Sequence, residues 1–562
     1  MDRNLFLALG LSFLVVTLWA YSTTPEAGPE NTVPAIQEPT AVPADGLGTL
    51  PQPAPSDTAE ALPDVAPFEL DKSQPSEPGD SSEPEQRAEL ETRLYRSLWT
   101  TRGGGLLKWE LTRYRTKRDK GSSGVSLVTT HLGVPLALAT PLEGLGFGDL
   151  STATYTLTQP DEQTLLFALE RGGVRVTKEF RFEEDSYILA MRFAIENGGD
   201  RHIRPNFRVR WPVQQLDALD YQELSLAAWH DGSLETGTLG TGGGFLGIGG
   251  PLDGPVEYVG DVQWVGAQLR YFVSALLPAQ PRDAAARFQP LAGGALGVAD
   301  LAFRPVDLPP GQRVARDLRI YIGPKESERL NEIGAHLDEA IPKGWFAPLT
   351  NFFIWLLAVM HEVLPNYGVA IIAITILVRV LMVPILAKQM KSMKRMGELQ
   401  PRMKAIQEKY GDDRQKQSEE MMKLYKETGF NPVAGCLPMI LQLPVFIGLY
   451  YALQGAIELR HAPFVAWIND LSAPETLFVI PGLELPIRVL PLLMGGSMIL
   501  QQSLTPMTTM DPAQAKMMKW MLPSVFTIMF YQFASGLVLY WLVSNVLGIA
   551  QQWYTNRQKA GS

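Results

Sequence analysis

The chain has 562 residues, a net charge of −10 and 46% hydrophobic residues, averages that suit a large soluble protein with several domains. However, residues 1–345 have a net charge of −15, whereas residues 346–562 have a net charge of +5 and contain 17 of the 19 Met. This division excludes a uniform soluble protein. The single cysteine, Cys436, excludes an intrachain disulfide framework, a Cys-based zinc site and an iron–sulfur cluster.

The first 86 residues combine an apolar run with an acidic segment. Residues 5–21 carry no charge and follow Arg3, which is typical of a transmembrane anchor or a cleavable signal peptide. Trp19 and Tyr21 favour the anchor, because aromatic residues collect at membrane interfaces. Residues 22–86 hold 13 Pro, 13 acidic residues and one Lys, so they predict a disordered tether that cannot bury a core. Whether residues 5–21 form an anchor or a signal peptide, we expect the residues that follow them to be exported from the cytoplasm.

The next segment, residues 87–343, has the pattern of a β-rich domain. Apolar and polar residues alternate in five short stretches, at 155–158, 178–182, 187–195, 207–211 and 319–322. This alternation predicts half-buried antiparallel strands, and their spacing predicts a large β-sandwich. Residues 326–341 have helical periodicity and predict a helix that connects this domain to the apolar part.

The remainder of the chain contains apolar runs of membrane-spanning length, at 352–386, 434–455, 489–503 and 521–554. The last run would form a helix of ~51 Å at ~1.5 Å per residue, against a hydrocarbon core of ~30 Å. We therefore expect two short helices joined at residues 533–536. With the anchor, this gives six crossings and two cytoplasmic termini.

The charges of the loops predict the same orientation. Residues 388–431 carry 11 Lys or Arg and 7 acidic residues, whereas residues 458–484 carry one Arg and four acidic residues. The positive-inside rule places the first segment in the cytoplasm and the second in the periplasm.

The predicted organisation has eleven segments. They are the anchor 1–21, the periplasmic tether 22–86, the β-domain 87–343, an interfacial segment with the second transmembrane helix 344–387, a cytoplasmic helical hairpin 388–431, the third transmembrane helix 432–456, a periplasmic loop 457–487, the fourth transmembrane helix 488–505, a cytoplasmic loop 506–519, the fifth and sixth transmembrane helices 520–554, and a cytoplasmic tail 555–562.

The cytoplasmic segment is expected to form two amphipathic helices, at 401–410 and 413–428, separated by a turn at Gly411. Five of its methionines are candidates for a recruitment surface: Met390, Met393, Met403, Met421 and Met422. Methionine is flexible and adapts to many partners. Its use here fits either packing within the hairpin or binding of a partner, and the sequence leaves both interpretations open.

Arg379 is a single charge deep in the apolar sequence, nine residues before Lys388, or ~13 Å of helix. Such a residue is a functional candidate, although an Arg side chain could also extend to the lipid headgroups. Residues 374–384, which surround Arg379, and the later apolar runs contain no Asp, Glu or His. This disfavours a proton-coupled transporter, which normally needs such a relay.

Polar residues on the predicted helices could form a pocket with Arg379. Thr375 lies one turn earlier on the same face, and Gln442, Ser544 and Asn545 could contribute from other helices. Each of these could instead make an ordinary hydrogen bond between helices.

A wet, positively charged pocket at membrane depth suits the acidic or polar segment of a nascent membrane protein. Transfer of the attached apolar segment into lipid is favourable by roughly 25 cal/mol per Å², so no nucleotide or other cofactor is expected. Two alternatives are a solute or lipid transporter with an extracytoplasmic binding domain, and a membrane-bound glycan enzyme. The sequence disfavours the glycan enzyme, because it shows no pair of carboxylates that can be placed in one cleft.

The apolar part resembles the YidC/Oxa1/Alb3 family of membrane protein insertases, and within it the Gram-negative YidC group. The similar stretches cover nearly all of residues 346–556. They are the arginine-bearing segment 374–384, Gly411-Asp-Asp, Asn431-Pro-Val-Ala-Gly-Cys-Leu-Pro, Gln442-Leu-Pro-Val-Phe, Leu449-Tyr-Tyr, residues 458–464 and 467–472, and Ser535-Gly-Leu-Val-Leu-Tyr-Trp-Leu-Val-Ser-Asn.

The resemblance implies a polytopic α-helical protein of the bacterial inner membrane, with a five-helix core around a hydrophilic groove. It implies that Arg379 is the groove arginine, that Thr375 lies beside it, and that Tyr540 and Trp541 contact substrate helices. The periplasmic domain would be a non-catalytic antiparallel β-super-sandwich, similar to sugar-binding folds.

The resemblance also implies the partners. They are nascent membrane proteins, the Sec translocon, ribosome–nascent chain complexes and the phospholipid bilayer, with no metal and no recognition of nucleic-acid sequence. The cytoplasmic hairpin would help to recruit substrate. The tail after Tyr554 is short and weakly basic, which departs from a strong ribosome-binding tail.

Overall fold

The computed structural model describes residues 84–118, 121–130, 134–214, 224–239, 252, 254–291, 296–344, 346–411, 413–428, 437–482, 485–504 and 512–560. Within the helices, the description leaves out most side chains of residues 385–400 and those of 437–441, 512–518 and 555–560. The predicted anchor and nearly all of the predicted tether lie outside the described residues.

Seventeen strands form the β-domain. They are β1 (Arg87–Glu91), β2 (Tyr95–Thr100), β3 (Gly105–Arg115), β4 (Gly124–Thr129), β5 (Thr156–Asp161), β6 (Thr164–Arg171), β7 (Val174–Phe182), β8 (Ile188–Asn197), β9 (Arg208–Gln214), β10 (Ser225–His230), β11 (Ser233–Thr238), β12 (Val256–Val259), β13 (Val262–Gln268), β14 (Phe272–Pro278), β15 (Ala284–Leu291), β16 (Leu296–Phe303) and β17 (Arg313–Pro324). Each of the five stretches predicted from alternation contributes to one of them: β5, β7, β8, β9 and β17.

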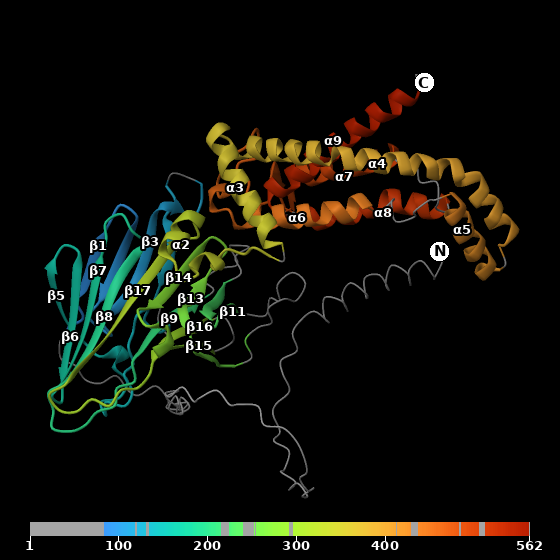
Figure 1. Ribbon diagram of the computed structural model, residues 1–562. Helices are drawn as coiled ribbons and strands as arrows, with labels where there is room; N and C mark the ends of the chain where they lie inside the picture. Colours follow the sequence, from blue (N-terminus) through green and yellow to red (C-terminus); the bar gives the residue numbers. More distant parts are fainter. Residues whose placement is uncertain are drawn as a thin grey trace, which may run out of the picture. The chain divides into compact units, whose positions relative to one another are not determined.

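The strands form two layers of antiparallel sheet (Figure 1). One layer is a nine-stranded sheet in the order β11-β10-β13-β14-β17-β8-β7-β6-β5. The other contains two four-stranded sheets, β1-β2-β3-β4 and β12-β15-β16-β9. Residues 137–139 connect these two sheets, because Ala137 bridges to β3 and Ala139 bridges to β9. The prediction of an antiparallel β-rich domain is therefore confirmed.

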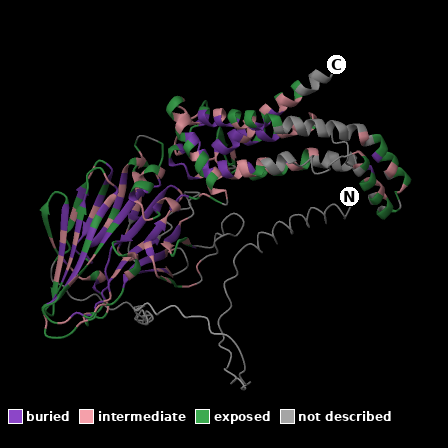
Figure 2. Cartoon of the chain, in the orientation of Figure 1, coloured by how far each residue is buried: buried purple, intermediate pink, exposed green. Residues whose placement is uncertain are grey.

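Figure 2 shows buried residues, in purple, along the strands of the β-domain, and the largest of them are aromatic. Trp99, Trp109, Trp211 and Trp264 are at most 1% exposed. Along β7 the side chains at positions 174, 176, 178, 180 and 182 are buried while the intervening ones face outward, as the two-residue period of a strand requires. Burying these rings is the dominant favourable contribution to the domain's stability.

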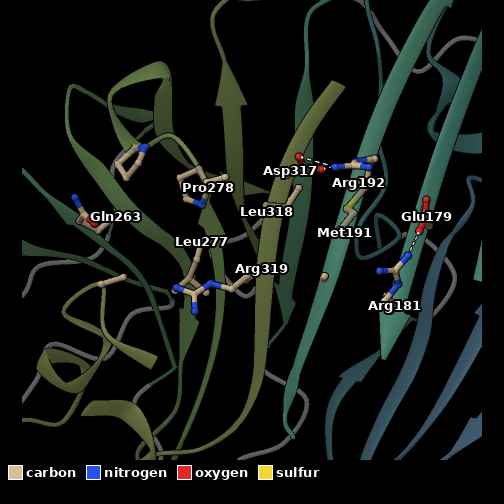
Figure 3. Close-up of a pocket in the computed structure, with 14 residues that line it drawn as sticks. Glu179, Arg181, Met191, Arg192, Gln263, Leu277, Pro278, Asp317, Leu318 and Arg319 are labelled. Carbon is tan, nitrogen blue, oxygen red and sulfur yellow. Dashed lines mark hydrogen bonds and ion pairs between the residues drawn. The ribbon is translucent and has the colours of Figure 1, made fainter. Parts of the chain in front are cut away.

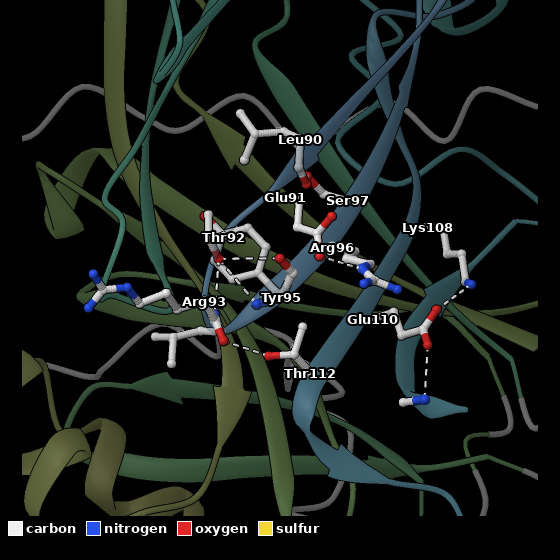
Figure 4. Close-up of polar contacts among 12 residues, drawn as sticks. Leu90, Glu91, Thr92, Arg93, Tyr95, Arg96, Ser97, Lys108, Glu110 and Thr112 are labelled. Carbon is white, nitrogen blue, oxygen red and sulfur yellow. Dashed lines mark hydrogen bonds and ion pairs between the residues drawn. The ribbon is translucent and has the colours of Figure 1, made fainter. Parts of the chain in front are cut away.

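Side-chain hydrogen bonds stabilise the first hairpin of this domain (Figure 4). The Thr92 hydroxyl oxygen accepts from the backbone N–H groups of Leu94 and Tyr95, which fixes the turn between β1 and β2. Thr112 donates to the Arg93 carbonyl at 2.7 Å and connects this turn to β3. Glu110 receives a hydrogen bond from the Gly124 N–H at 2.9 Å, where β4 begins.

The helices of the remaining chain are α2 (Ser327–Ile333), α3 (Ala347–Val363), α4 (Tyr367–Lys409), α5 (Arg414–Thr428), α6 (Leu437–Gly455), α7 (Val489–Leu504), α8 (Pro512–Phe530) and α9 (Ser535–Ala560). The short strands β18 (Phe478–Ile480) and β19 (Leu485–Ile487) pair between α6 and α7. Short 3-10 turns occur at Leu150–Thr152, Pro281–Asp283, Leu337–Ala340 and Ile457–Leu459.

Three expectations about helices need correction. The predicted helix at 326–341 ends at Ile333, because Gly334 adopts a positive φ of 73° and a separate turn follows. The apolar run 352–386 is divided between α3 and α4, since Asn366 accepts from the Val369 N–H and starts a new helix. The predicted helix at 401–410 is the end of α4, which continues for 43 residues through Pro384 and Pro401.

The expected division of the last apolar run into two helices is confirmed, but the junction lies slightly earlier than the predicted residues 533–536, because α8 ends at Phe530 and α9 begins at Ser535. Side chains from the helices form a second hydrophobic core, which includes Phe353, Ile374, Leu449, Met494 and Tyr540. Among the described residues, one stretch is long and apolar enough to cross a membrane, Tyr367–Pro384 on α4, and α3 and α7 are shorter apolar helices.

Candidate functional site

Arg379 lies on α4, inside the apolar stretch 367–384. The next two residues, Val380 and Leu381, are 61% and 66% exposed, while the Arg379 side chain is partly buried against α9. One helix therefore presents aliphatic side chains on one side and a guanidinium toward its neighbour on the other. In a membrane-spanning helix, a charged side chain normally faces the protein interior in this way.

Ser544 of α9 is the hydrogen-bond partner of Arg379. Arg379 Nη2 donates to the Ser544 carbonyl oxygen at 2.7 Å and to its hydroxyl oxygen at 2.9 Å, and Nε donates to the same hydroxyl at 3.1 Å. Within the described part of the chain, no carboxylate lies at ion-pair distance from Arg379. The guanidinium is thus oriented by neutral oxygens, and its positive charge is not neutralised by an acidic side chain.

Gly548 provides space for this arrangement, one turn after Ser544 on the same face of α9. A Cβ atom at this position would lie 3.4 Å from Arg379 Nη2 and 2.9 Å from Gln501 Nε2 of α7. An alanine Cβ would therefore displace the Gln501 amide, whereas its distance from Arg379 Nη2 is an ordinary van der Waals contact; a bulkier side chain would reach the guanidinium as well. Sequence reasoning missed Gly548, although its four-residue spacing from Ser544 places both on one helix face.

Thr375 occupies the same face of α4 as Arg379 but is nearly fully buried. Its hydroxyl donates to the Ile371 carbonyl of its own helix at 2.7 Å. A threonine that bonds back to its own helix satisfies its hydroxyl without a partner from another element. Thr375 is therefore buried among the helices, one helical turn before Arg379 on α4.

The other predicted polar residues form separate pairs across the helices. Gln442 of α6 donates to the Tyr540 hydroxyl at 2.8 Å, and Asn545 donates to the Ser497 hydroxyl of α7 at 3.0 Å. Tyr540, Ser544 and Asn545 are all buried. Polar contacts therefore connect α9 to α4, α6 and α7, and Ser497 is a member that the sequence did not reveal.

Trp541 packs in an aromatic cluster with α6 and α8. Its ring centroid lies 4.9 Å from that of Phe446, 5.1 Å from Phe530 and 5.6 Å from Phe526. Tyr540 and Trp541 therefore differ in role. Tyr540 belongs to the buried core, whereas Trp541 is partly exposed at the junction of three helices.

The candidate methionines lie along α4 and α5. Met390 and Met393 lie on α4, but the structure describes only their backbone and not their side chains. Met403 is 5% exposed, whereas Met422 is 53% exposed and Met421 is intermediate. The same segment therefore contains one methionine that packs inside and one that is available to a partner.

Comparisons with known proteins match this architecture in both parts. The family profile described as "YidC periplasmic domain" matches residues 87–356, and the one described as "60Kd inner membrane protein" matches residues 359–561. A membrane protein insertase YidC of Nitratidesulfovibrio vulgaris (strain DP4) is 35% identical over 99% of both chains. The chain belongs to the YidC family of membrane protein insertases.

One further relative and one solved structure are similar to this chain. An insertase YidC of Geobacter sp. (strain M21) is 36% identical over 83% of this chain and 85% of its own length. A crystal structure of an active YidC insertase with its first transmembrane domain resolved has a TM-score of 0.37 and 17% identity, over 84% of this chain and 93% of that chain. The family profiles and the two relatives confirm the resemblance stated from the sequence.

Proposed function

We propose that this chain inserts nascent proteins into the bacterial inner membrane and helps them to fold, without enzymatic chemistry. The observation that carries the proposal is Arg379, a guanidinium held by Ser544 with no carboxylate partner in the described part of the chain. An acidic or polar segment of a client can interact with this charge at membrane depth. The adjoining apolar segment then moves into lipid, which is favourable.

Arg379 lowers the free-energy barrier that the client's polar segment meets as it crosses the membrane. It does not change the free energy of the inserted client. A charge at the centre of a membrane helix is unfavourable by at least ~2.5 kcal/mol on insertion scales. A client carboxylate can offset part of this unfavourable free energy by forming charge-assisted hydrogen bonds with the guanidinium. Because Ser544 offers only neutral oxygens, the arginine remains available for such a guest.

The remaining segments have supporting roles in this proposal. The chain crosses the membrane six times with both termini in the cytoplasm, and the β-domain lies in the periplasm. The positive hairpin of α4 and α5 recruits clients through exposed methionines such as Met422. The chain works alone or with the Sec translocon, and it receives ribosome–nascent chain complexes. Trp541 and Tyr540 border the client's path.

Substitution of Arg379 tests the mechanism. We expect Arg379→Ala to abolish insertion of small clients with acidic translocated tails, whereas Arg379→Lys retains most of the activity because the positive charge is kept. The measurement is protease protection of a labelled client in liposomes that contain the purified chain and no nucleotide. A client whose tail has Asn in place of Asp provides the control, because it does not depend on charge pairing.

Equal insertion by Arg379→Ala and the wild type, across several acidic-tailed clients, would contradict the role of this residue. Failure of the wild-type chain to insert any client in nucleotide-free liposomes would contradict the proposed function as a whole.

A further inference from the structure

The outer face of the nine-stranded sheet contains a hollow of about 650 Å³ (Figure 3). Strands β7, β8, β13, β14 and β17 form it, and Ala335, after α2, lines its edge. Its floor includes Ala190 and Leu277, which lie in one row with Arg319 across β8, β14 and β17. A small residue at position 190 leaves space between the long side chains of the neighbouring strands.

Strand pairing explains the charged rim of this hollow. Glu179, Arg192 and Asp317 face one another in one row across β7, β8 and β17. Arg192 donates to both oxygens of Asp317, at 2.7 and 3.2 Å. Arg181 donates to Glu179 at 2.9 Å. These two arginines are therefore already paired with acidic side chains.

Arg319 is different from the other two arginines of the rim. It lies opposite Ala190 in the next row, and its Nη2 donates a hydrogen bond of 3.4 Å to the Ile333 carbonyl. Among the described residues no carboxylate lies at ion-pair distance from it. The rim therefore presents an arginine whose remaining donors can bind a carboxylate in the planar, bidentate geometry that guanidinium groups prefer.

A second hollow of about 270 Å³ continues along the same strands. Its floor contains Ala194, and Arg175 and Arg313 lie on either side of Glu196 in its last row. From position 175 to position 181 of β7 the two hollows extend over ~20 Å, at ~3.3 Å per residue. This length and shape suit an extended polypeptide. A sugar is a poorer fit, because none of the lining residues is aromatic and could stack on a sugar ring.

We propose that these two hollows bind a translocated client segment that carries Asp or Glu between small apolar residues, with Arg319 as the carboxylate-binding residue. This inference rests on the proposed function, because the segment reaches the β-domain only after insertion. The apolar floor receives the client's small side chains, and the arginines provide complementary charge. The site thus holds a client after translocation and is not required for insertion itself.

Photocrosslinking tests the site in the full-length chain. A photoreactive residue replaces Gln263, which lines the hollow without belonging to an arginine–carboxylate pair. The probe is a single-span client with an Asp-containing tail, inserted into inside-out membrane vesicles whose lumen contains the β-domain. We expect an adduct with the tail, reduced at least five-fold by Arg319→Gln or by Asn in place of the tail's Asp, and largely retained in Arg319→Lys.

Arg171→Gln is the matched control, because Arg171 is an exposed arginine at the end of β6 and lines neither hollow. An adduct as strong in Arg319→Gln as in the wild type, equal adducts with Asp and Asn tails, or an equal loss in Arg171→Gln would overturn the proposal. Protease protection of the client in the same vesicles separates the two ideas. Normal insertion without an adduct contradicts only the site, whereas absent insertion contradicts the proposed function.

Discussion

The positive charge of Arg379 depends on how closely α9 approaches α4. Ser544 supplies two neutral acceptors to the guanidinium, and Gly548 leaves the space into which Nη2 extends. Hydrogen bonds to a charged group are worth about 1.5–3 kcal/mol each, so a small displacement of α9 changes the orientation of the arginine. Both α9 residues are therefore positioning residues for Arg379.

Enlarging Gly548 should reduce insertion without preventing folding. We expect Gly548→Ala to lower the insertion rate of acidic-tailed clients two- to five-fold, because its Cβ displaces the Gln501 amide that lies beside Arg379, and Gly548→Val to lower the rate further, because its larger side chain also reaches Arg379 Nη2. The measurement is protease protection of the client, normalised to the amount of chain in the membrane. Gly496→Ala on α7 is the control, because a Cβ there has no neighbour within 4 Å. An equal effect of the two alanine variants would contradict the role of Gly548.

Lys178 is a second buried cation, in the core of the β-domain and far from any acidic partner in the described structure. Its side chain is 0% exposed, and Nζ donates to the carbonyls of Gly103, Gly104 and Leu138 at 2.7, 3.0 and 3.3 Å. All three residues adopt positive φ, a conformation that is rare for Leu. Burial lowers the pKa of Lys178 to about 7, because desolvation disfavours the charged form.

This pKa shift predicts how the stability of the domain depends on pH. An unfolded lysine has a pKa of about 10.4, so between pH 7 and 10 the unfolded state binds more protons than the folded state. The free energy of unfolding therefore rises with pH, by about 1 kcal/mol per unit near pH 8. Thermal unfolding of the full chain in detergent, followed by tryptophan fluorescence, measures this. Lys178→Met should be less stable, because three carbonyls lose their donor, and its free energy of unfolding should rise less steeply with pH. Part of the rise remains, because burial also lowers the pKa of Lys325 to about 7. Equal slopes for both proteins would contradict the shift of Lys178.

At the scale of elements, the loop after α6 determines where two helices begin. The Ser535 hydroxyl donates to the Asp470 carbonyl at 2.6 Å and the Gly536 N–H donates to the Leu471 carbonyl at 2.9 Å. Glu475, which is 5% exposed, accepts from the Leu490 N–H at 2.7 Å at the start of α7. A carboxylate in this position satisfies a free N–H group and interacts favourably with the helix dipole.

Removal of this cap should destabilise the helical part. We expect Glu475→Ala to lower the free energy of unfolding by about 1–2 kcal/mol, because the buried Leu490 N–H loses its acceptor. Glu475→Gln should retain more of the stability, since an amide oxygen can still accept. The unfolding temperature in detergent measures both variants. A Glu475→Ala protein as stable as the wild type would show that the cap is not needed.

Elements whose pattern is local were predictable from the sequence, while those that depend on distant partners were not. The strand at 178–182 follows from alternation, yet this alternation does not reveal that β8 pairs with β17 across more than 100 residues. Nor does it reveal that position 178 places a lysine in the core. Helix length compared with membrane thickness predicted a break near residues 533–536, whereas the helix start expected at Pro401 is absent, because α4 continues through this proline without interruption.

The candidate site likewise contains a residue that the sequence pattern reveals and others that only the packing of the helices reveals. Arg379 was evident because a charge in an apolar run is conspicuous in any sequence. Its partner was one of several polar residues on α9, and only the packing of α4 against α9 distinguishes Ser544 from Asn545, whose amide faces Ser497. Arg319 was not conspicuous, because an arginine on an exposed strand is common.

At the scale of the whole molecule, the distribution of charge should determine orientation in the membrane. Residues 388–431 contain an excess of four positive charges and residues 458–484 an excess of three negative charges. Short positive loops are retained in the cytoplasm. We therefore expect α5 to be cytoplasmic and the β18–β19 hairpin to be periplasmic.

Single cysteines test this orientation, because Cys436 is the one native thiol. In a Cys436→Ser chain, a cysteine at Thr476, which is exposed next to β18, should react with a membrane-impermeant maleimide in intact spheroplasts. One at Gln415, which is exposed on α5, should react only after the membrane is permeabilised. Four lysines added around Thr476 should reduce this asymmetry, because they compete with the positive charges of 388–431. Labelling of both cysteines in intact spheroplasts, or unchanged asymmetry with the added lysines, would contradict control of topology by these charges.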